Sequence, residues 1–388
     1  MSRRLGALAL AVVLAIAAAL AFGGIGGRSA GDGLADDPTT TTAPRKSVDE
    51  VVAEVEAFVA KTRGLEFKRK VPVQLLDGAA FKARLLKDAE KDKADTQVDG
   101  RVLTALGLID RGVDLYAVLL RFIGDAVVGF YDTDTHELVV RAGTLTPYAR
   151  ATLAHELTHA LDDQWFDLDR PELDERGHDE EALAFSAVVE GNAVRVEDAY
   201  RKTLSSAERL QASLEETRLA TGVDLQGVPD VVPQMISFPY VSGPPFVRAL
   251  LKVGGERRVD AALRVPPTTS EDILDPGAWL AGNHAVTVPV PKAGGPELDH
   301  GVYGESTLEL TLAPIVGWST AGAAAKGWAG DRYVAWDAGL GRACVRATFA
   351  MDTPDDLDQL ASALRKWAKA EGATVDRRAT TVGFTACR

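Results

Sequence analysis

The segment from Thr146 to Gln164 is the feature that most constrains the fold of this chain. Thr146 offers a capping hydroxyl and Pro147 stands in the first turn, a combination typical of the start of a helix. Apolar residues then recur at helical spacing, whereas His155 and His159 fall on another face. The pattern predicts a helix that packs on its apolar side and presents two imidazoles together.

The two histidines form the pattern His155-Glu156-Leu157-Thr158-His159. Side chains four residues apart on a helix point the same way, so both imidazoles can reach one metal ion. Zn²⁺ suits such a site because it accepts neutral imidazoles and one carboxylate and leaves a fourth position open for water. Glu156 would then act as general base, which predicts metal-dependent hydrolysis of peptide bonds.

A third ligand is needed to complete the site. An extended metzincin pattern is absent, because its glycine and histidine positions hold Asp162 and Trp165. A second long helix is predicted from Asp179 to Leu204, and Glu190 lies in its middle among apolar residues. An unpaired carboxylate would be costly there, so we predict Glu190 as the third metal ligand.

Four neighbouring residues carry further expectations. Glu197 projects from nearly the same helix face as Glu190 but stands in a charged stretch typical of a solvated surface, although it could also support a metal ligand from behind. Gly191 is expected to allow close approach of the motif helix. Asp163 could accept the second ring N–H of His159 and Asp162 could serve another group, or both could simply solvate the helix end.

At this point the chain resembles the gluzincin branch of the zincin metallopeptidases, in which HExxH is followed by a helix with a glutamate ligand. The matching residues are His155, Glu156, His159 and Glu190, with Ala193 three residues on. The sequence looks most similar to exported bacterial members with the pattern HELTHALxDQxFDL, here His155 to Leu168, and the resemblance covers about residues 129–197. It implies a zincin-like domain and a peptide or protein substrate.

A zinc peptidase also needs a hydrogen-bond donor for the oxyanion that forms at the scissile carbonyl. The sequence offers His178, His284, His300, Tyr303 and Tyr131. His300 and Tyr303 are the preferred candidates, because the stretch around them is dense in glycine and polar residues.

The N-terminal region predicts export. An apolar run from Leu5 to Phe22 follows Arg3 and Arg4 and precedes acidic residues, so the body should lie outside the cytoplasmic membrane. Residues 1–26 read as a signal peptide or as a single-pass anchor, and residues 27–46, rich in Gly, Asp, Thr and Pro, read as a tether. The protein is then membrane-anchored, or secreted if the segment is cleaved.

Charge and cysteine content narrow the class of protein further. The formal net charge is -13, which argues against nucleic acid as a partner. Cys344 and Cys387 are the only cysteines, and in an exported protein such a pair favours a disulfide over two free thiols.

The predicted fold class is α+β, with a zincin-like catalytic domain at 47–296 and a C-terminal lobe of helices and a small sheet at 297–388. A hairpin is predicted at 126–141, a helix opening at Gly243, and C-terminal strands at 333–336, 343–350 and 378–384. The alternatives are a non-catalytic zinc-containing scaffold of the cell envelope and a hydrolase of non-peptide amides. The sequence leaves the oligomeric state unknown.

Overall fold

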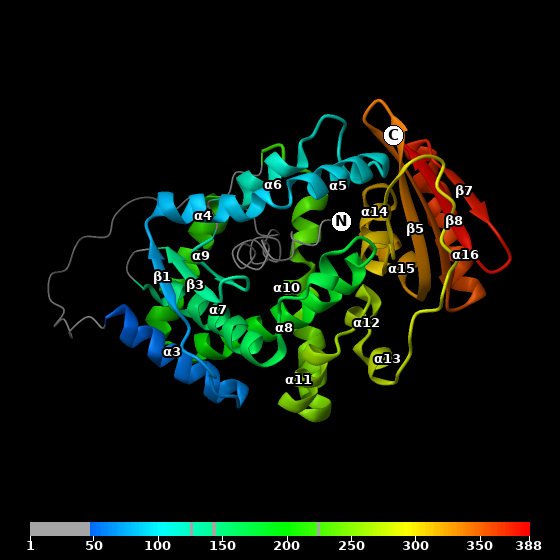
Figure 1. Cartoon of the computed structure of the whole chain (residues 1–388). Helices are drawn as coiled ribbons and strands as arrows, with labels where there is room; N and C mark the ends of the chain where they lie inside the picture. The colour runs from blue at the N-terminus through cyan, green and yellow to red at the C-terminus, as the bar shows by residue number, and fades with distance from the viewer. Residues whose placement is uncertain (1–46, 125–126, 142–144, 223–225) are drawn as a thin grey trace.

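The computed structural model describes residues 47–124, 127–141, 145–222 and 226–388. The predicted signal or anchor and the tether lie outside these residues. Within them the chain is of mixed α+β class, with a helical body at one end and a larger sheet at the other (Figure 1). The body contains α3 (Val48–Arg63), α4 (Gly78–Glu90), α5 (Lys93–Ala105), α6 (Leu115–Gly124), α7 (Pro147–Phe166), α8 (Asp179–Thr203), α9 (Ser206–Gly222), α10 (Val231–Gly254), α11 (Glu256–Arg264), α12 (Ser270–Leu274) and α13 (Pro276–Leu280).

A small sheet lies against the predicted motif helix. Its strands are β1 (Val73–Leu76), β2 (Gly129–Asp132) and β3 (Glu137–Arg141), in the order β1-β3-β2. β1 runs parallel to β3, and β2 pairs antiparallel with β3 in the predicted hairpin. Because β2 is the edge strand and packs against α7, it brings backbone groups directly to that helix.

α8 and α10 cross at two glycines. A β-carbon on Gly191 would lie 2.3 Å from the backbone carbon of Gly243, and one on Gly243 would lie 2.1 Å from the carbonyl oxygen of Ala187. Both distances are far below ordinary contact, so only glycine permits this spacing. The prediction that Gly191 admits the motif helix was therefore wrong, because the helix that it admits is α10.

α10 also begins earlier than predicted. Its start was expected at Gly243, because proline is typical of a first turn, but the helix begins at Val231 and contains Pro239, Pro244 and Pro245. An internal proline removes a backbone hydrogen bond and costs about 3 kcal/mol. The apolar burial of α10 against α8 offsets this cost, which local propensity could not reveal.

The C-terminal part is an antiparallel five-stranded sheet with helices on one face. Its strands, in the spatial order β4-β5-β6-β8-β7, are β4 (Glu297–Gly301), β5 (Trp328–Gly339), β6 (Arg342–Met351), β8 (Val382–Cys387) and β7 (Thr374–Arg377). The helices are α14 (Glu305–Val316), α15 (Trp318–Ala325) and α16 (Pro354–Glu371). β5 and β6 are longer than predicted. The predicted last strand is replaced by β7 and β8, and β4 was not predicted.

A buried carboxylate joins the two parts. Glu180, at the start of α8, accepts hydrogen bonds from the backbone N–H and the hydroxyl of Ser270, at 2.7 and 2.8 Å. It also packs so closely on Gly304 that any β-carbon there would overlap it. Burial raises the pKa of Glu180 to about 8.

Cys344 and Cys387 stand opposite each other on β6 and β8 and form a disulfide, which confirms the predicted pair. A disulfide is typical of proteins that fold in an oxidising compartment. Among the helices that the structure describes, none is both long and apolar enough to span a bilayer.

Candidate metal centre

α7 is enclosed along almost its whole length. The hydroxyl of Thr146 accepts a hydrogen bond from the N–H of Ala149, and Pro147 occupies the first turn, as predicted. The helix then packs against α3, α8, α9 and β2, so even its titratable residues are buried. Polar groups in such a position need partners, and those partners define the site.

His155, His159 and Glu190 converge between α7 and α8. The Nε2 atom of His155 lies 3.1 Å from Oε2 of Glu190, and Nε2 of His159 lies 3.7 Å from the same oxygen. One ligand atom from each residue lies within 4.8 Å of the other two, and all three residues are buried. The three predicted ligands thus form a group that could hold one metal ion.

The hydrogen bonding of His159 fits an ion at this position. Neither ring nitrogen of His159 has a hydrogen-bond partner among the described residues, although both are buried. A buried polar group without a partner costs about 1–3 kcal/mol. Two imidazoles and one carboxylate are also a donor set that Zn²⁺ accepts, so the residues present fit zinc.

The pKa shifts of the two histidines also fit a cation bound between them and Glu190. Burial lowers the pKa of His155, but the carboxylates of Glu190 and Glu197 outweigh it and raise that pKa above its usual value. Burial, together with the charge of His155, lowers the pKa of His159. These shifts favour a protonated His155 beside Glu190, and a divalent cation at the same place would compete with that proton.

Glu156 faces the edge strand β2. Its Oε2 atom accepts a hydrogen bond from the backbone N–H of Tyr131, at 2.9 Å. Burial is the largest influence on this carboxyl and raises its pKa to about 8, and the charge of Glu190 acts in the same direction. Glu156 is thus adjacent to the metal-ligand group without belonging to it, and it has an affinity for protons near neutrality.

Tyr240, on α10, is the site residue that the sequence did not reveal. Its ring lies nearly parallel to the His155 imidazole, with ring centroids 6.4 Å apart and an interplanar angle of 15°. Burial raises its pKa well above the usual value, and the neighbouring Glu190 and Glu156 carboxylates do the same. The phenol therefore stays protonated and can donate a hydrogen bond. The apolar run around Tyr240 gave no signal of this role, because its position depends on the Gly191–Gly243 crossing.

Glu197 does not lie on a solvated face, as its charged surroundings suggested, but beside His155, in line with the other expectation for it. It is 2% exposed, and its Oε2 atom lies 3.3 Å from Nδ1 of His155, although not at a hydrogen-bond angle. Arg201 donates from Nε to Glu197 at 2.8 Å and from Nη1 to Glu216 on α9 at 3.0 Å. Glu197, Arg201 and Glu216 thus form a chain of charged contacts from α8 to α9. This chain ends at Nδ1 of His155, on the opposite side of the ring from Glu190.

Asp162 and Asp163 are both buried, so neither merely solvates the helix end. Asp162 accepts hydrogen bonds from Nε and Nη2 of Arg63 on α3, at 3.0 and 2.9 Å, and another from Asn192 on α8. The structure also does not place Asp163 on His159. Asp163 instead accepts hydrogen bonds from the hydroxyl of Tyr131, at 2.7 Å, and from the backbone N–H of Leu168.

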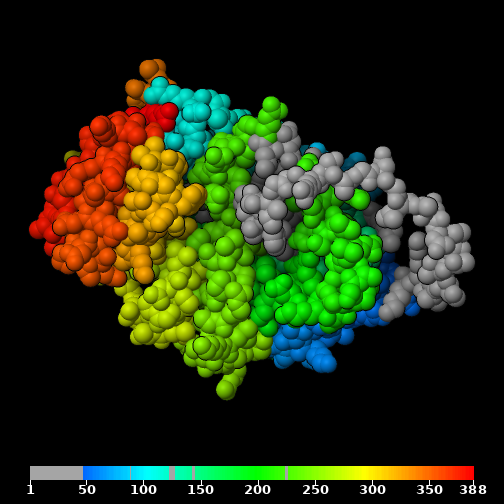
Figure 2. Space-filling view, turned by 180° about the vertical axis from the view of Figure 1, so that it is seen from behind, coloured from blue at the N-terminus to red at the C-terminus, as the bar shows by residue number. Residues whose placement is uncertain are grey.

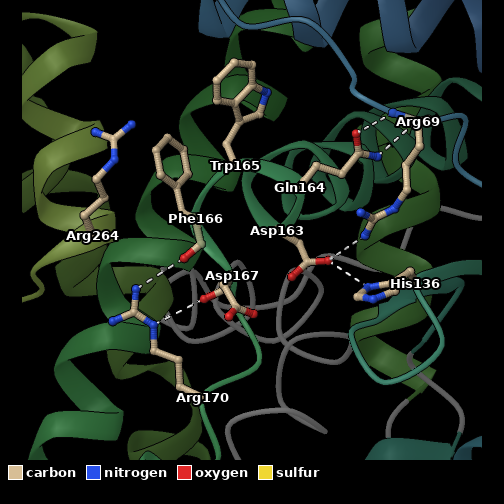
Figure 3. Close-up of a pocket in the computed structure, with 9 residues that line it drawn as sticks. All are labelled: Arg69, His136, Asp163, Gln164, Trp165, Phe166, Asp167, Arg170 and Arg264. Atoms are coloured by element: carbon tan, nitrogen blue, oxygen red, sulfur yellow. Dashed lines mark hydrogen bonds and ion pairs between the residues drawn. The ribbon is translucent and has the colours of Figure 1, made fainter.

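Asp163 also forms part of the wall of a surface pocket of about 500 Å³ at the carboxyl end of α7 (Figure 3). There it lies 2.9 Å from Nδ1 of His136 and 3.6 Å from Arg69, while Arg170 reaches the backbone on the other side of the pocket. Tyr131 donates one hydrogen bond from its hydroxyl to Asp163 and another from its backbone N–H to Glu156. The same residue therefore positions the pocket wall and the Glu156 carboxylate.

The predicted oxyanion donors lie elsewhere, with the exception of Tyr131. The hydroxyl of Tyr303 is buried in the C-terminal core, 2.5 Å from that of Thr311. His300 pairs with Glu297 on β4, and His178 pairs with Glu181. His284 lies in an exposed loop. The glycine-rich polar stretch around His300 and Tyr303 therefore did not indicate the position of the candidate metal centre.

Comparison with known proteins adds one match. Residues 291–386 match a domain of unknown function, DUF8575, which corresponds to the C-terminal sheet and its helices. No curated protein and no solved structure matches the chain. The match covers only the C-terminal part, so the assignment of function depends on the group around α7.

Proposed function

We propose that the protein is a zinc-dependent metallopeptidase of zincin-like fold that hydrolyses peptide bonds outside the cytoplasm. The observation that carries the proposal is the buried convergence of His155, His159 and Glu190 with Glu156 immediately beside them. A structural zinc site normally closes all four positions with protein atoms. A group of three protein ligands next to a separate carboxylate instead matches the requirements of hydrolysis.

The chain would hold the ion through Nε2 of both histidines and the carboxylate of Glu190. Zinc bound there would supply a Lewis acid that activates water and polarises a carbonyl. Glu156 would take a proton from the attacking water and deliver it to the leaving amine, a role that its raised pKa supports. The N–H of Tyr131 orients this carboxylate on the side of β2.

Tyr240 would donate its phenolic hydrogen to the oxyanion of the tetrahedral intermediate. Support for this assignment comes from its place over the His155 ring, its burial and its high pKa. Tyr240→Phe removes only the hydroxyl. Loss of one such donor typically lowers kcat by about 10² to 10³ while binding changes little.

Export is part of the proposal. The arginine-flanked apolar run at the N-terminus, the acidic tether and the disulfide support a body outside the membrane. Fractionation of the native host should recover the protein with the envelope or the medium. Full-length protein recovered in the soluble cytoplasmic fraction would contradict the export.

The central test separates the base from the ligands. The purified chain is assayed on a mixed peptide library with and without chelator, and zinc content is measured for Glu156→Gln and His159→Ala. We expect Glu156→Gln to keep its zinc and lose activity by about 10² to 10⁴, and His159→Ala to lose both.

Glu172→Gln, an exposed change in charge outside the site, is the matched control and should leave activity and zinc unchanged. Wild-type cleavage by Glu156→Gln would refute the assignment. Retained zinc with no hydrolysis of any peptide by the wild type would instead support the non-catalytic scaffold, and cleavage of non-peptide amides alone would support the other alternative.

A further inference from the structure

A second concave site lies between the helical body and the C-terminal sheet. It is a pocket of about 660 Å³ lined by α5, the segment after it, the β5–β6 hairpin and the end of the chain. α5, the hairpin tip and the last residues meet at one end of the molecule (Figure 2). Four arginines line it, namely Arg101, Arg111, Arg342 and Arg388.

Two of these arginines bind other groups of the protein through their guanidinium groups, and two do not. Arg101 donates to the carbonyl oxygens of Gly341 and Arg342 and pairs with Asp337 at 3.0 Å. Arg388 pairs with Glu371 at 2.9 Å. The guanidinium groups of Arg111 and Arg342 make no hydrogen bond or ion pair with the residues that the structure describes.

This arrangement stands out in a protein of net charge -13. One carboxylate, that of Asp114, also lines the pocket, and it accepts a hydrogen bond from the backbone N–H of Ala117. Carboxylates farther than about 8 Å are largely screened at physiological ionic strength, so the lining keeps an excess of positive charge. A guanidinium presents paired N–H donors that match the oxygens of a phosphate. Two uncommitted guanidinium groups therefore provide more donors than one carboxylate can use, and a phosphate ester can satisfy both.

The hairpin tip adds an apolar element at the same rim. Leu340 is 97% exposed and has a backbone φ of 55°, in the left-handed region. A non-glycine residue costs about 1–2 kcal/mol in this conformation. The two-residue turn Leu340-Gly341 requires a positive φ at both positions, so the hairpin itself explains the backbone conformation. The exposed apolar side chain contributes nothing to this turn, whereas contact with an acyl chain would remove it from water.

We propose that this pocket binds a phosphate ester, held by Arg111 and Arg342, and that an anionic phospholipid is its source, with Leu340 against an acyl chain. The proposal is independent of the metal centre. It gives the C-terminal part a role of its own, because the hairpin that carries Leu340 and Arg342 belongs to the matched domain.

The test uses the purified full-length chain and calorimetric titration with three probes: glycerol 3-phosphate, dihexanoylphosphatidylglycerol below its micelle concentration, and the matching phosphatidylcholine. The variant Arg111→Gln/Arg342→Gln should lose at least tenfold in affinity for the first two probes. The control Arg218→Gln/Arg365→Gln makes the same charge change at exposed arginines outside the pocket and should bind like the wild type.

Leu340→Asn distinguishes the sources, because asparagine tolerates the left-handed conformation but lacks the apolar side chain. Loss of affinity for phosphatidylglycerol alone would support a lipid source, and unchanged affinity for both phosphates would support a soluble phosphate ester in the same site. The proposal is overturned if neither phosphate binds saturably, if both double variants lose affinity equally, or if phosphatidylcholine binds as tightly as phosphatidylglycerol. All variants change exposed side chains, so their thermal unfolding midpoints should match the wild type.

Discussion

The crossing of α8 and α10 makes a sharp prediction for Gly191→Ala. The new β-carbon would lie 2.3 Å from the carbon and 2.4 Å from the oxygen of the Gly243 carbonyl. Ordinary contact begins near 3.4 Å, so α10 must move away by about 1 Å, and overpacking of this kind costs about 1–3 kcal/mol. Alanine recovers about 1 kcal/mol through helix propensity, which leaves a net loss of up to about 2 kcal/mol.

The displacement also has a local consequence. Glu190 precedes Gly191 on α8, and Tyr240 lies one turn before Gly243 on α10, so the same movement separates the phenol from the metal ligands. We expect Gly191→Ala to retain zinc, because its ligands lie on α7 and α8, but to lose about tenfold or more in kcat.

The measurement is urea unfolding together with zinc content and peptide hydrolysis. Gly222→Ala is the matched control, because a β-carbon at the end of α9 meets no described atom within 4 Å. It should be neutral or slightly stabilising. If Gly191→Ala were as stable and as active as Gly222→Ala, the close crossing and the placement of Tyr240 that depends on it would both be wrong.

Three further predictions concern the ligand set, the junction and the disulfide. Glu190→Ala should sharply lower zinc content measured by atomic absorption, whereas Glu197→Ala should keep most of the metal, and the reverse order would make Glu197 the ligand. The pKa of Glu180 is raised to about 8 in the fold and is about 4.3 in an unfolded chain, so its contribution to stability is complete below about pH 4 and is lost as the pH rises from there to about 8. Glu180→Gln should therefore flatten the fall in unfolding free energy between about pH 5 and pH 8, and an unchanged slope would mean that other groups cause that fall. Removing the disulfide with Cys344→Ala/Cys387→Ala should cost up to about 4 kcal/mol for a sequence separation of 43, and wild-type stability in urea would show that strand pairing alone holds β8.

The parts of the site that the sequence predicted depend on local chemistry. Thr146 and Pro147 mark the start of α7 within one turn, and the spacing of His155 and His159 fixes their common face without reference to any other segment. Glu190 could be selected because its immediate neighbours are apolar. Each of these signals lies within a few residues of the feature that it predicts.

The parts that the sequence missed depend on contacts between distant segments. Glu197 stands among charged residues, but α7 places His155 against its carboxylate and α9 supplies Glu216 to its partner Arg201. Tyr240 reaches Glu190 through a glycine crossing whose partners are far apart in the chain. β4 has few strand-forming residues and exists because it pairs with β5.

The link between Arg63 and Asp162 sets a limit on how far the N-terminus can be trimmed. Arg63 ends α3, whose first turn is capped by Ser47, and its fully buried guanidinium neutralises an aspartate on the motif helix. Leaving such a charge buried without its partner costs about 3–5 kcal/mol. A cut before Ser47 should therefore leave α7 intact, whereas a cut within α3 would remove the Ser47 cap from the helix that carries Arg63 and would destabilise α7 and the candidate metal ligands on it.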